Sequence, residues 1–346
     1  MKRFKKLLLW VIIGLLLQTL LLWYLDKYIL GKDINIQITK IPYEKKDKVY
    51  NTKVKIPLEA KNIKISSEAE YISYFSGKKL NIIDIEKGTT ESFPVTEKST
   101  ILDYEWVENR SRLLILEGEK EKNSSRVKIS YYDAKKHLKE EIAHLAWANI
   151  EDTTGHIVIS PVIEMIYINI TEKDKSRVYS VDLMKNVKEI NLGKTSVGNM
   201  LVTKENVLLY ENLEDSSLMQ YNKGEIKEIS KLKGTRLWAL DKKENIYLYE
   251  MKNSKVSDIL YIDNISRLNN IKNRNFKRIS LDKEYNLNSI YLKDNGEVYV
   301  KDQETDIIKG CNSHKVFKYE GDFIGFYKYG FLYKDIKGHI KILEIK

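Results

Sequence analysis

The side chains that most often carry acid–base and metal chemistry are few in this chain. It contains five histidines and a single cysteine, Cys311. The histidines are His137, His144, His156, His314 and His339. None of them belongs to an H-E-x-x-H motif or to another short metal-binding spacing, and one cysteine forms neither an internal disulfide nor a multi-cysteine zinc site. We therefore expect structural roles for these side chains, with no metal and no cofactor.

Two further segments contain reactive residue types at close spacing. Gly193–Gly198 includes Ser196, but its spacing differs from the G-x-S-x-G nucleophile elbow and no helix-rich segment surrounds it. Asp302–Asp306 contains three carboxylates, yet it lacks the glycine and the distal glutamate of a calcium-binding loop. The sequence also has no glycine-rich phosphate loop. We interpret both segments as loops and expect no catalytic residues in them.

Tryptophans are the other candidates for function. Three lie beyond the apolar N-terminal run, namely Trp106, Trp147 and Trp238. Each precedes or opens the second strand of its unit in the repeat described below, which predicts a position near the inner strands. Because aromatic anchors suit partner binding, we regard all three as candidate partner-binding residues. The alternative is that their rings fill the wedges between neighbouring units.

The elements that must position these residues are short strands. Apolar runs alternate with polar turns about every 8–12 residues, which is typical of all-β folds. One pattern recurs, a strand of β-branched and aromatic residues that ends in Asp or a substitute. Its seven copies are Leu80–Asp84, Ile129–Asp133, Val178–Asp182, Leu218–Asn222, Ile259–Asp263, Val298–Asp302 and Ile340–Glu344. Successive copies end 39 to 49 residues apart, and this period predicts a seven-bladed β-propeller, with six or eight blades as alternatives.

The last unit has room for three strands only. They are expected near Val316–Tyr319, Gly330–Tyr333 and His339–Ile345. A missing fourth strand would leave a row of unpaired N–H and C=O groups. Thr52–Ile56 alternates, with Val54 and Ile56 on one face and lysines on the other. We predict that this segment pairs antiparallel with His339–Ile345 and closes the ring, with Val54 opposite one of the last ten residues.

The first two units resemble a known class of propeller. Ser66–Tyr74, followed by Lys79–Asp84 and Gly88, looks like a repeat of the TolB or dipeptidyl-peptidase IV N-terminal type. Tyr104–Trp106 followed by Asn109–Ile115 is similar to a second copy, whereas later units keep only the strand-and-Asp rhythm. The usual Pro-Asp-Gly turn is missing throughout. The resemblance implies a fold rather than an activity, and no motif of the peptidases' α/β-hydrolase domain is present.

Leu7–Leu25 is an uncharged apolar run of 19 residues. A helix of this length comes close to the ~30 Å hydrocarbon core of a bilayer, and the basic residues before it favour a cytoplasmic N-terminus. The alternative is a cleaved signal peptide, but no small-residue cleavage site follows. No cysteine follows either, which excludes a lipoprotein anchor. We therefore expect a cytoplasmic tail at 1–6, a transmembrane helix at 7–25, a juxtamembrane linker at 26–51 and an extracytoplasmic propeller at 52–346.

Charge and composition restrict the partners. The net charge is +10, and Lys2, Arg3, Lys5 and Lys6 precede the apolar run. No dense basic stripe interleaved with aromatic residues follows, so we expect no nucleic-acid partner. The Ile, Lys and Asn bias suggests a bacterial source. The sequence predicts a non-catalytic, membrane-anchored binding or scaffolding module of a bacterial envelope, whose partner is an envelope protein, a peptide or a wall polymer. The alternative is an envelope enzyme acting on glycans or peptides, with a dispersed site at the propeller mouth.

Overall fold

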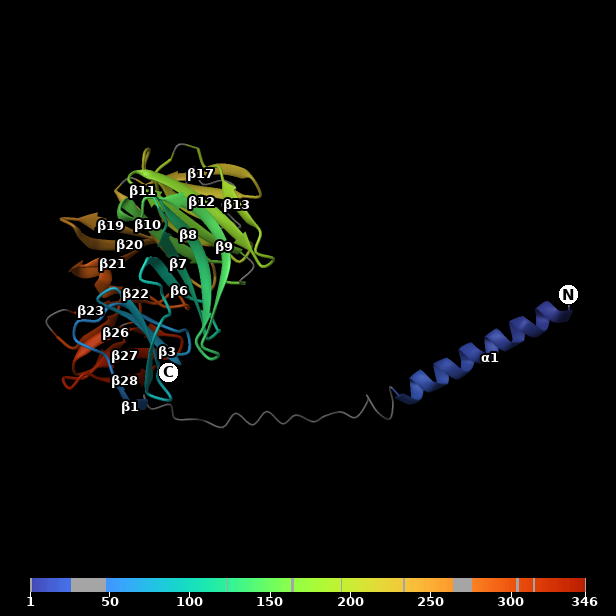
Figure 1. Cartoon of the computed structure of the whole chain (residues 1–346). Coiled ribbons are helices and arrows are strands. Elements are labelled where there is room, and N and C mark those ends of the chain that lie inside the picture. The colour runs from blue at the N-terminus through green and yellow to red at the C-terminus, as the bar shows by residue number, and fades with distance from the viewer. Residues whose placement is uncertain are drawn as a thin grey trace. The chain divides into compact units, whose positions relative to one another are not determined.

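The computed structural model describes residues 2–25 and 48–345, apart from residues 123, 163, 164, 194, 233, 264–275, 303, 304 and 314. The chain divides into two units, Met1–Lys45 and Lys46–Lys346, and each is described by itself (Figure 1). The first unit contains α1 (Lys2–Leu25). Among the residues that the structure describes, no helix reaches both the length and the apolar character needed to cross a bilayer.

The second unit consists of seven four-stranded antiparallel sheets (Figure 1). First strands of neighbouring sheets contact one another around most of the ring, so the first strand of each sheet is innermost and the fourth is outermost. The predicted seven-bladed β-propeller is therefore confirmed. Strands alternate in direction, which places the turns from first to second strand and from third to fourth strand on one face. We call this the front face, for example residues 107–111 and 134–137 of the second sheet, and the opposite one the back face.

In blades 1 to 4 the strands follow one another along the chain from innermost to outermost. Blade 1 contains β2 (Lys61–Ile65), β3 (Tyr71–Ser76), β4 (Lys79–Asp84) and β5 (Thr89–Ser92). Blade 2 contains β6 (Ser99–Trp106), β7 (Arg112–Lys120), β8 (Ser125–Asp133) and β9 (Leu138–Ala148). Blade 3 contains β10 (Thr153–Ile159), β11 (Met165–Glu172), β12 (Lys175–Asp182) and β13 (Val187–Ile190). Blade 4 contains β14 (Val197–Val202), β15 (Leu208–Asn212), β16 (Ser217–Asn222) and β17 (Glu225–Lys231).

Blades 5 and 6 follow the same order, and blade 7 takes its outermost strand from the start of the β unit. Blade 5 contains β18 (Thr235–Leu240), β19 (Ile246–Lys252), β20 (Lys255–Ile262) and β21 (Lys277–Tyr285). Blade 6 contains β22 (Ile290–Leu292), β23 (Val298–Lys301), β24 (Ile307–Gly310) and β25 (Val316–Lys318). Blade 7 contains β26 (Asp322–Tyr327), β27 (Gly330–Lys334), β28 (His339–Glu344) and β1 (Lys48–Lys55). The short 3-10 helices η2 (Ile150–Asp152) and η4 (Leu287–Ser289) precede β10 and β22.

Blade 7 is built from both ends of the β unit. β1 pairs antiparallel with β28, with Lys48–Asn51 opposite Lys341–Glu344 and Lys55 opposite His339. The predicted ring closure is therefore confirmed. The strand begins at Lys48, upstream of the expected Thr52.

The apolar side chains at the end of β1 and directly after it are buried, as the alternating sequence predicts. Val54 and Ile56 are each 3% exposed, whereas Lys53 is exposed. The ladder is irregular between Asn51 and Lys55, and no residue lies directly opposite Val54 in its register. The expectation for Val54 itself is thus wrong, although its strand pairs as predicted.

The recurrent segment marks the third strand in every blade except blade 6. Val298–Asp302 there contains β23, which is a second strand. Val316–Tyr319, expected in the last unit, contains β25 and so completes blade 6 instead. The strands of blade 6 have only three or four residues each. Fourteen residues separate β20 from β21 in blade 5. This added length brings the second strand of blade 6 to the interval expected of a third strand.

Aromatic and aliphatic side chains fill the spaces between blades. Tyr71 of blade 1 stacks on Trp106 of blade 2, with ring centroids 5.7 Å apart. In blade 7, Phe323, Phe326 and Phe331 form a cluster with centroids 5.4 to 5.9 Å apart, which packs against blade 6. Rings at these separations add attraction to the area that they bury. The packed wedges fix the inner strands around a central channel.

Candidate functional site

The inner strands carry backbone groups that have no partner in their own sheet, because each is an edge strand. Polar side chains of neighbouring blades bind several of these groups. Asp103 Oδ2 accepts a hydrogen bond from the Ile157 N–H at 2.8 Å and so links blades 2 and 3. Asn199 Nδ2 donates to the Leu237 carbonyl oxygen at 2.7 Å and links blades 4 and 5. The channel wall is therefore polar at defined positions.

Four charged or titratable side chains meet on this wall. Lys64 of β2 lies 2.8 Å from Glu105 Oε2 and 3.5 Å from Asp103 Oδ1, both on β6. His156 of β10 places Nδ1 3.8 Å from Asp103 Oδ2. We call this set the channel cluster. It joins the first three blades, and no sequence motif pointed to it.

Surroundings decide the charge state of the two bases in the channel cluster. Burial disfavours the charged form of Lys64, but Glu105 and Asp103 outweigh this effect and raise its pKa above 10.5. The pKa of His156 is lowered from 6.5, first because the channel wall desolvates the ring, an effect that Asp103 opposes. Its side chain is still 49% exposed to the channel. At neutral pH the cluster thus contains a protonated lysine beside a neutral imidazole.

A cavity of about 580 Å³ opens beside the channel cluster, at the front-face end of the inner strands. Its wall includes Glu105 and Trp106 of β6, His156–Ile159 of β10, Asn199–Val202 of β14 and Trp238–Leu240 of β18. Ser160 also lines it, and its buried hydroxyl has no hydrogen-bond partner among the described residues. An apolar wall with a few polar groups is typical of a ligand site of this size. The cavity is therefore the main candidate for binding.

The three candidate tryptophans occupy different environments. Trp106 is 6% exposed and donates its indole N–H to Ser73 Oγ at 2.9 Å, so it fills the wedge between blades 1 and 2. Trp238 is partly buried on β18 and, with Trp106, lines the cavity. Trp147 is 47% exposed on β9, the outermost strand of blade 2. The expected position near the inner strands is wrong for Trp147, because β9 is 11 residues long and continues past the assumed blade boundary.

The remaining histidines and the cysteine lie away from this cavity or outside the described residues. Cys311 is partly buried, and burial, with a contribution from Asp282, raises the pKa of its thiol to about 11. His314 is one of the residues that the structure does not describe. In the described ranges, no group of three or more His, Cys, Asp and Glu side chains is arranged to hold a metal ion. The other three histidines pair with polar neighbours, His137 with Glu91, His144 with the Ala146 carbonyl oxygen and His339 with Asp335.

The two reactive-looking segments are connections between strands. Gly193–Gly198 runs from the end of β13 into β14 and joins blades 3 and 4. Asp302–Asp306 joins β23 to β24 within blade 6. Both were expected to be loops, and the parts of them that the structure describes agree with that interpretation.

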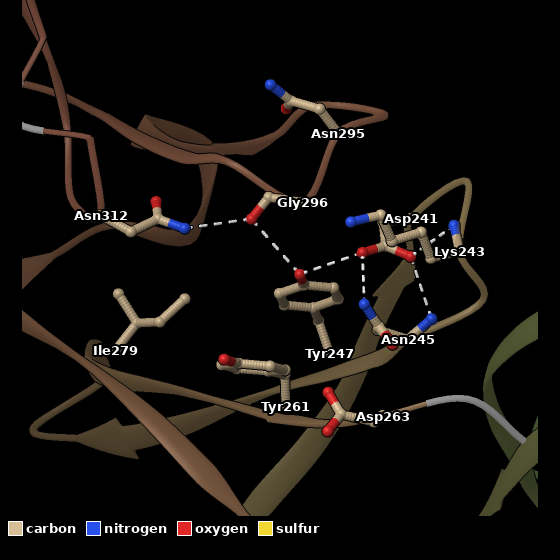
Figure 2. Close-up of a pocket in the computed structure, with 10 residues that line it drawn as sticks. All are labelled: Asp241, Lys243, Asn245, Tyr247, Tyr261, Asp263, Ile279, Asn295, Gly296 and Asn312. Carbon is tan, nitrogen blue, oxygen red and sulfur yellow. Dashed lines mark hydrogen bonds between the residues drawn. The ribbon is translucent and has the colours of Figure 1, made fainter. Parts of the chain in front are cut away.

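A second front-face cavity of about 460 Å³ lies between blades 5 and 6 (Figure 2). Tyr247 and Tyr261 stack there with centroids 5.4 Å apart. The Asp241 carboxylate accepts hydrogen bonds from the Asn245 N–H at 2.9 Å and from the Tyr247 hydroxyl at 3.2 Å. That hydroxyl also lies 3.3 Å from the Gly296 carbonyl oxygen of blade 6. These polar groups are engaged in turn geometry and in joining two blades, so we assign the cavity a structural role.

Comparison with known proteins supports the fold. No protein-family model and no curated protein matches this sequence. A solved prolyl endopeptidase matches with a TM-score of 0.55 and 10% identity over 75% of this chain and 42% of that one. Virginiamycin B lyase from Staphylococcus aureus matches with a TM-score of 0.54 and 12% identity over 87% of this chain and 100% of that one. TolB from Acinetobacter baumannii matches at 0.43 and 13% identity over 82% and 63%, a score too low to carry an argument.

The shared feature is the propeller. The resemblance to peptidase propellers, first suggested by two repeat units, therefore holds for the fold. This chain spans less than half the length of the prolyl endopeptidase that it matches. Identities of 10 to 13% carry no information about activity.

Proposed function

We propose that the chain is a non-catalytic, membrane-anchored binding or scaffolding module of a bacterial cell envelope. Its partner is an envelope protein, a peptide or a wall polymer that binds at the channel mouth. The observation that carries the proposal is the cavity of about 580 Å³, which combines Trp238 of β18 with residues from three other inner strands. Because packed blades hold these strands in place, the cavity is preformed, and a preformed site loses little entropy on binding.

The proposed anchor is Leu7–Leu25, which places the propeller outside the cytoplasm. Its support is the uncharged sequence of 19 residues and the four basic residues before it. Described side chains of this helix such as Trp10, Leu17 and Trp23 are 71%, 64% and 56% exposed. Large apolar side chains that are this exposed need an apolar environment to shield them from water, and a lipid bilayer provides one. Protease added to intact protoplasts should degrade the β unit, and a fully protected β unit would contradict this topology.

Binding at the channel mouth is tested with a matched pair of tryptophan variants. The tagged full chain is used to capture partners from detergent-solubilised envelopes. Trp238→Ala should abolish capture, because the indole forms part of the cavity wall. Trp147→Ala removes an equally large ring from the outer edge of blade 2 and should leave capture intact. Equal capture by both variants, with unchanged melting temperatures, would exclude the channel mouth as the binding site.

The channel cluster supports a second candidate, an envelope enzyme acting on glycans or peptides. His156 borders both the cluster and the cavity. A neutral imidazole can accept a proton from a bound ligand, and the Lys64 ammonium can stabilise negative charge that develops nearby. Turnover of wall fragments by the purified protein, lost in His156→Gln, would favour the enzyme. Binding of the same fragments without turnover would favour the binding module.

A further inference from the structure

A narrow apolar groove lies between blades 2 and 3 on the front face, with a volume of about 150 Å³. It is separated from the channel mouth by the turn at residues 107–111. Trp106 and Glu108 line the channel cavity, whereas Val107 and Arg110 line the groove. A cavity of this size holds one ring or one branched aliphatic group. The apolar wall consists of Val107, Leu114, Tyr131, Ile142, Ile166 and Val181.

Apolar side chains at the rim of the groove are exposed to solvent. Leu183 lines the groove and is 70% exposed, and its neighbour Met184 is 83% exposed. The turn that carries them is fixed by Asp182. Asp182 Oδ1 accepts hydrogen bonds from the N–H groups of Met184 and Asn186 at 2.9 Å, and Oδ2 accepts one from Asn186 Nδ2 at 2.8 Å. Exposed apolar groups on a fixed turn beside an apolar groove mark a contact surface.

The rim of the groove is positively charged, and one of its basic side chains has no ion-pair partner within the described ranges. Arg110 is exposed, and its guanidinium has no hydrogen bond or ion pair within the described ranges. Arg112 stands 5.0 Å above the centroid of the Tyr131 ring and 3.5 Å from Asp133. The acid in the lining, Asp182, is occupied by its own turn. A ligand that contributes a carboxylate would therefore find a free partner in Arg110.

We propose that this groove binds a linear peptide that carries a large apolar side chain next to acidic side chains. The apolar side chain enters the groove and packs against Leu183, while a carboxylate pairs with Arg110. The small volume selects a single side chain rather than several acyl chains, and the unpaired arginine selects an acidic neighbour. This site goes beyond the proposed channel-mouth function, because neither Leu183 nor Arg110 lines the channel cavity.

The test uses the full chain and a fluorescein-labelled synthetic peptide in which two leucines are flanked by aspartates. We expect its fluorescence anisotropy to rise with protein concentration, and the affinity to fall as salt is added. One control peptide has serines in place of the leucines, and another has lysines in place of the aspartates. The affinity for each control peptide should be lower by about tenfold or more, which corresponds to the loss of one apolar or ionic contact.

Two exposed positions allow the groove to be altered without changing the core. Arg110→Glu and Leu183→Glu should each weaken the leucine peptide by about tenfold or more. The matched controls are Lys243→Glu, an exposed lysine in the equivalent turn of blade 5, and Leu213→Glu, an apolar residue 39% exposed on the back face. Both controls should change affinity less than about twofold.

Several results would overturn the proposal. They are no binding of the leucine peptide, equal binding of the serine peptide, or equal weakening by Lys243→Glu and Arg110→Glu. Self-association of the chain that disappears in Leu183→Glu would assign the groove to a second copy and would also overturn it. Because Trp238→Ala leaves the groove intact, peptide binding and channel-mouth binding can fail separately.

Discussion

The strand that closes the ring can be tested at Ile56, the residue that directly follows it. This residue is 3% exposed and belongs to the core cluster that joins blades 7 and 1, together with Ile72 and Ile340. Ile56→Ala removes most of a buried side chain and leaves a cavity, which typically lowers the free energy of unfolding by about 2–5 kcal/mol. Its N–H donates to the Gly338 carbonyl oxygen at 3.3 Å, and alanine keeps that bond. The loss therefore reports packing alone.

The assays are urea denaturation and thermal unfolding of a chain that begins at Lys46, where the β unit begins. For a domain of this size we expect a fall in melting temperature of roughly 4–20 °C, from about 2–4 °C for each kcal/mol. Lys53→Ala lies on the exposed side of the same strand and should change stability by less than about 0.5 kcal/mol. If Ile56→Ala is as mild as Lys53→Ala, β1 is not part of the cooperative ring and the closure is wrong.

Two further changes test the buried charge between blades 4 and 5 and the pH response of the channel. Glu211 is 0% exposed and accepts hydrogen bonds from the Leu237 and Asn199 N–H groups and from Arg236, at 2.6, 3.0 and 3.1 Å. Glu211→Ala leaves these donors without their acceptor and should lower the free energy of unfolding by about 3–5 kcal/mol in urea denaturation. A loss below about 1 kcal/mol would refute the view that Glu211 holds blades 4 and 5 together. The pKa of His156 is lower in the folded state than the unfolded value of 6.5, so folding releases protons and stability falls as the pH decreases below 6.5. His156→Gln should reduce this fall, and an unchanged pH profile would contradict it.

The strand rhythm could be predicted because its causes are local. Asp84 and Asp133 each end a third strand, and their carboxylates accept hydrogen bonds from the N–H groups three residues later, at 2.9 and 3.0 Å. This is the turn chemistry that makes aspartate a marker of strand ends. The alternation of Val54 and Ile56 likewise predicted a half-buried strand. Blade 6 was misassigned because strands of three or four residues are too short to show alternation.

The site could not be predicted because its residues meet only through the packing of blades. Lys64 and His156 come from blades 1 and 3, and both approach Asp103 of blade 2. The one local signal was the presence of Asp103 and Glu105 on alternate positions of the strand Ser99–Trp106. The predicted position of Trp147 was wrong for a related reason. The length of β9 places this residue on the outer edge of blade 2, and that length could not be read from the sequence.

The closure of blade 7 also has a consequence for the time course of folding. Tyr50 of β1 and Glu344 of β28 are 294 positions apart in the chain. Bringing such distant segments together costs about 5 kcal/mol of chain entropy, estimated from the logarithm of loop length. At about 5–20 residues per second, β1 leaves the ribosome roughly 15–60 s before its partner is complete. During that interval β1 has no strand to pair with. Substitutions in β1 should therefore reduce the yield of folded protein more than they reduce its affinity for any ligand.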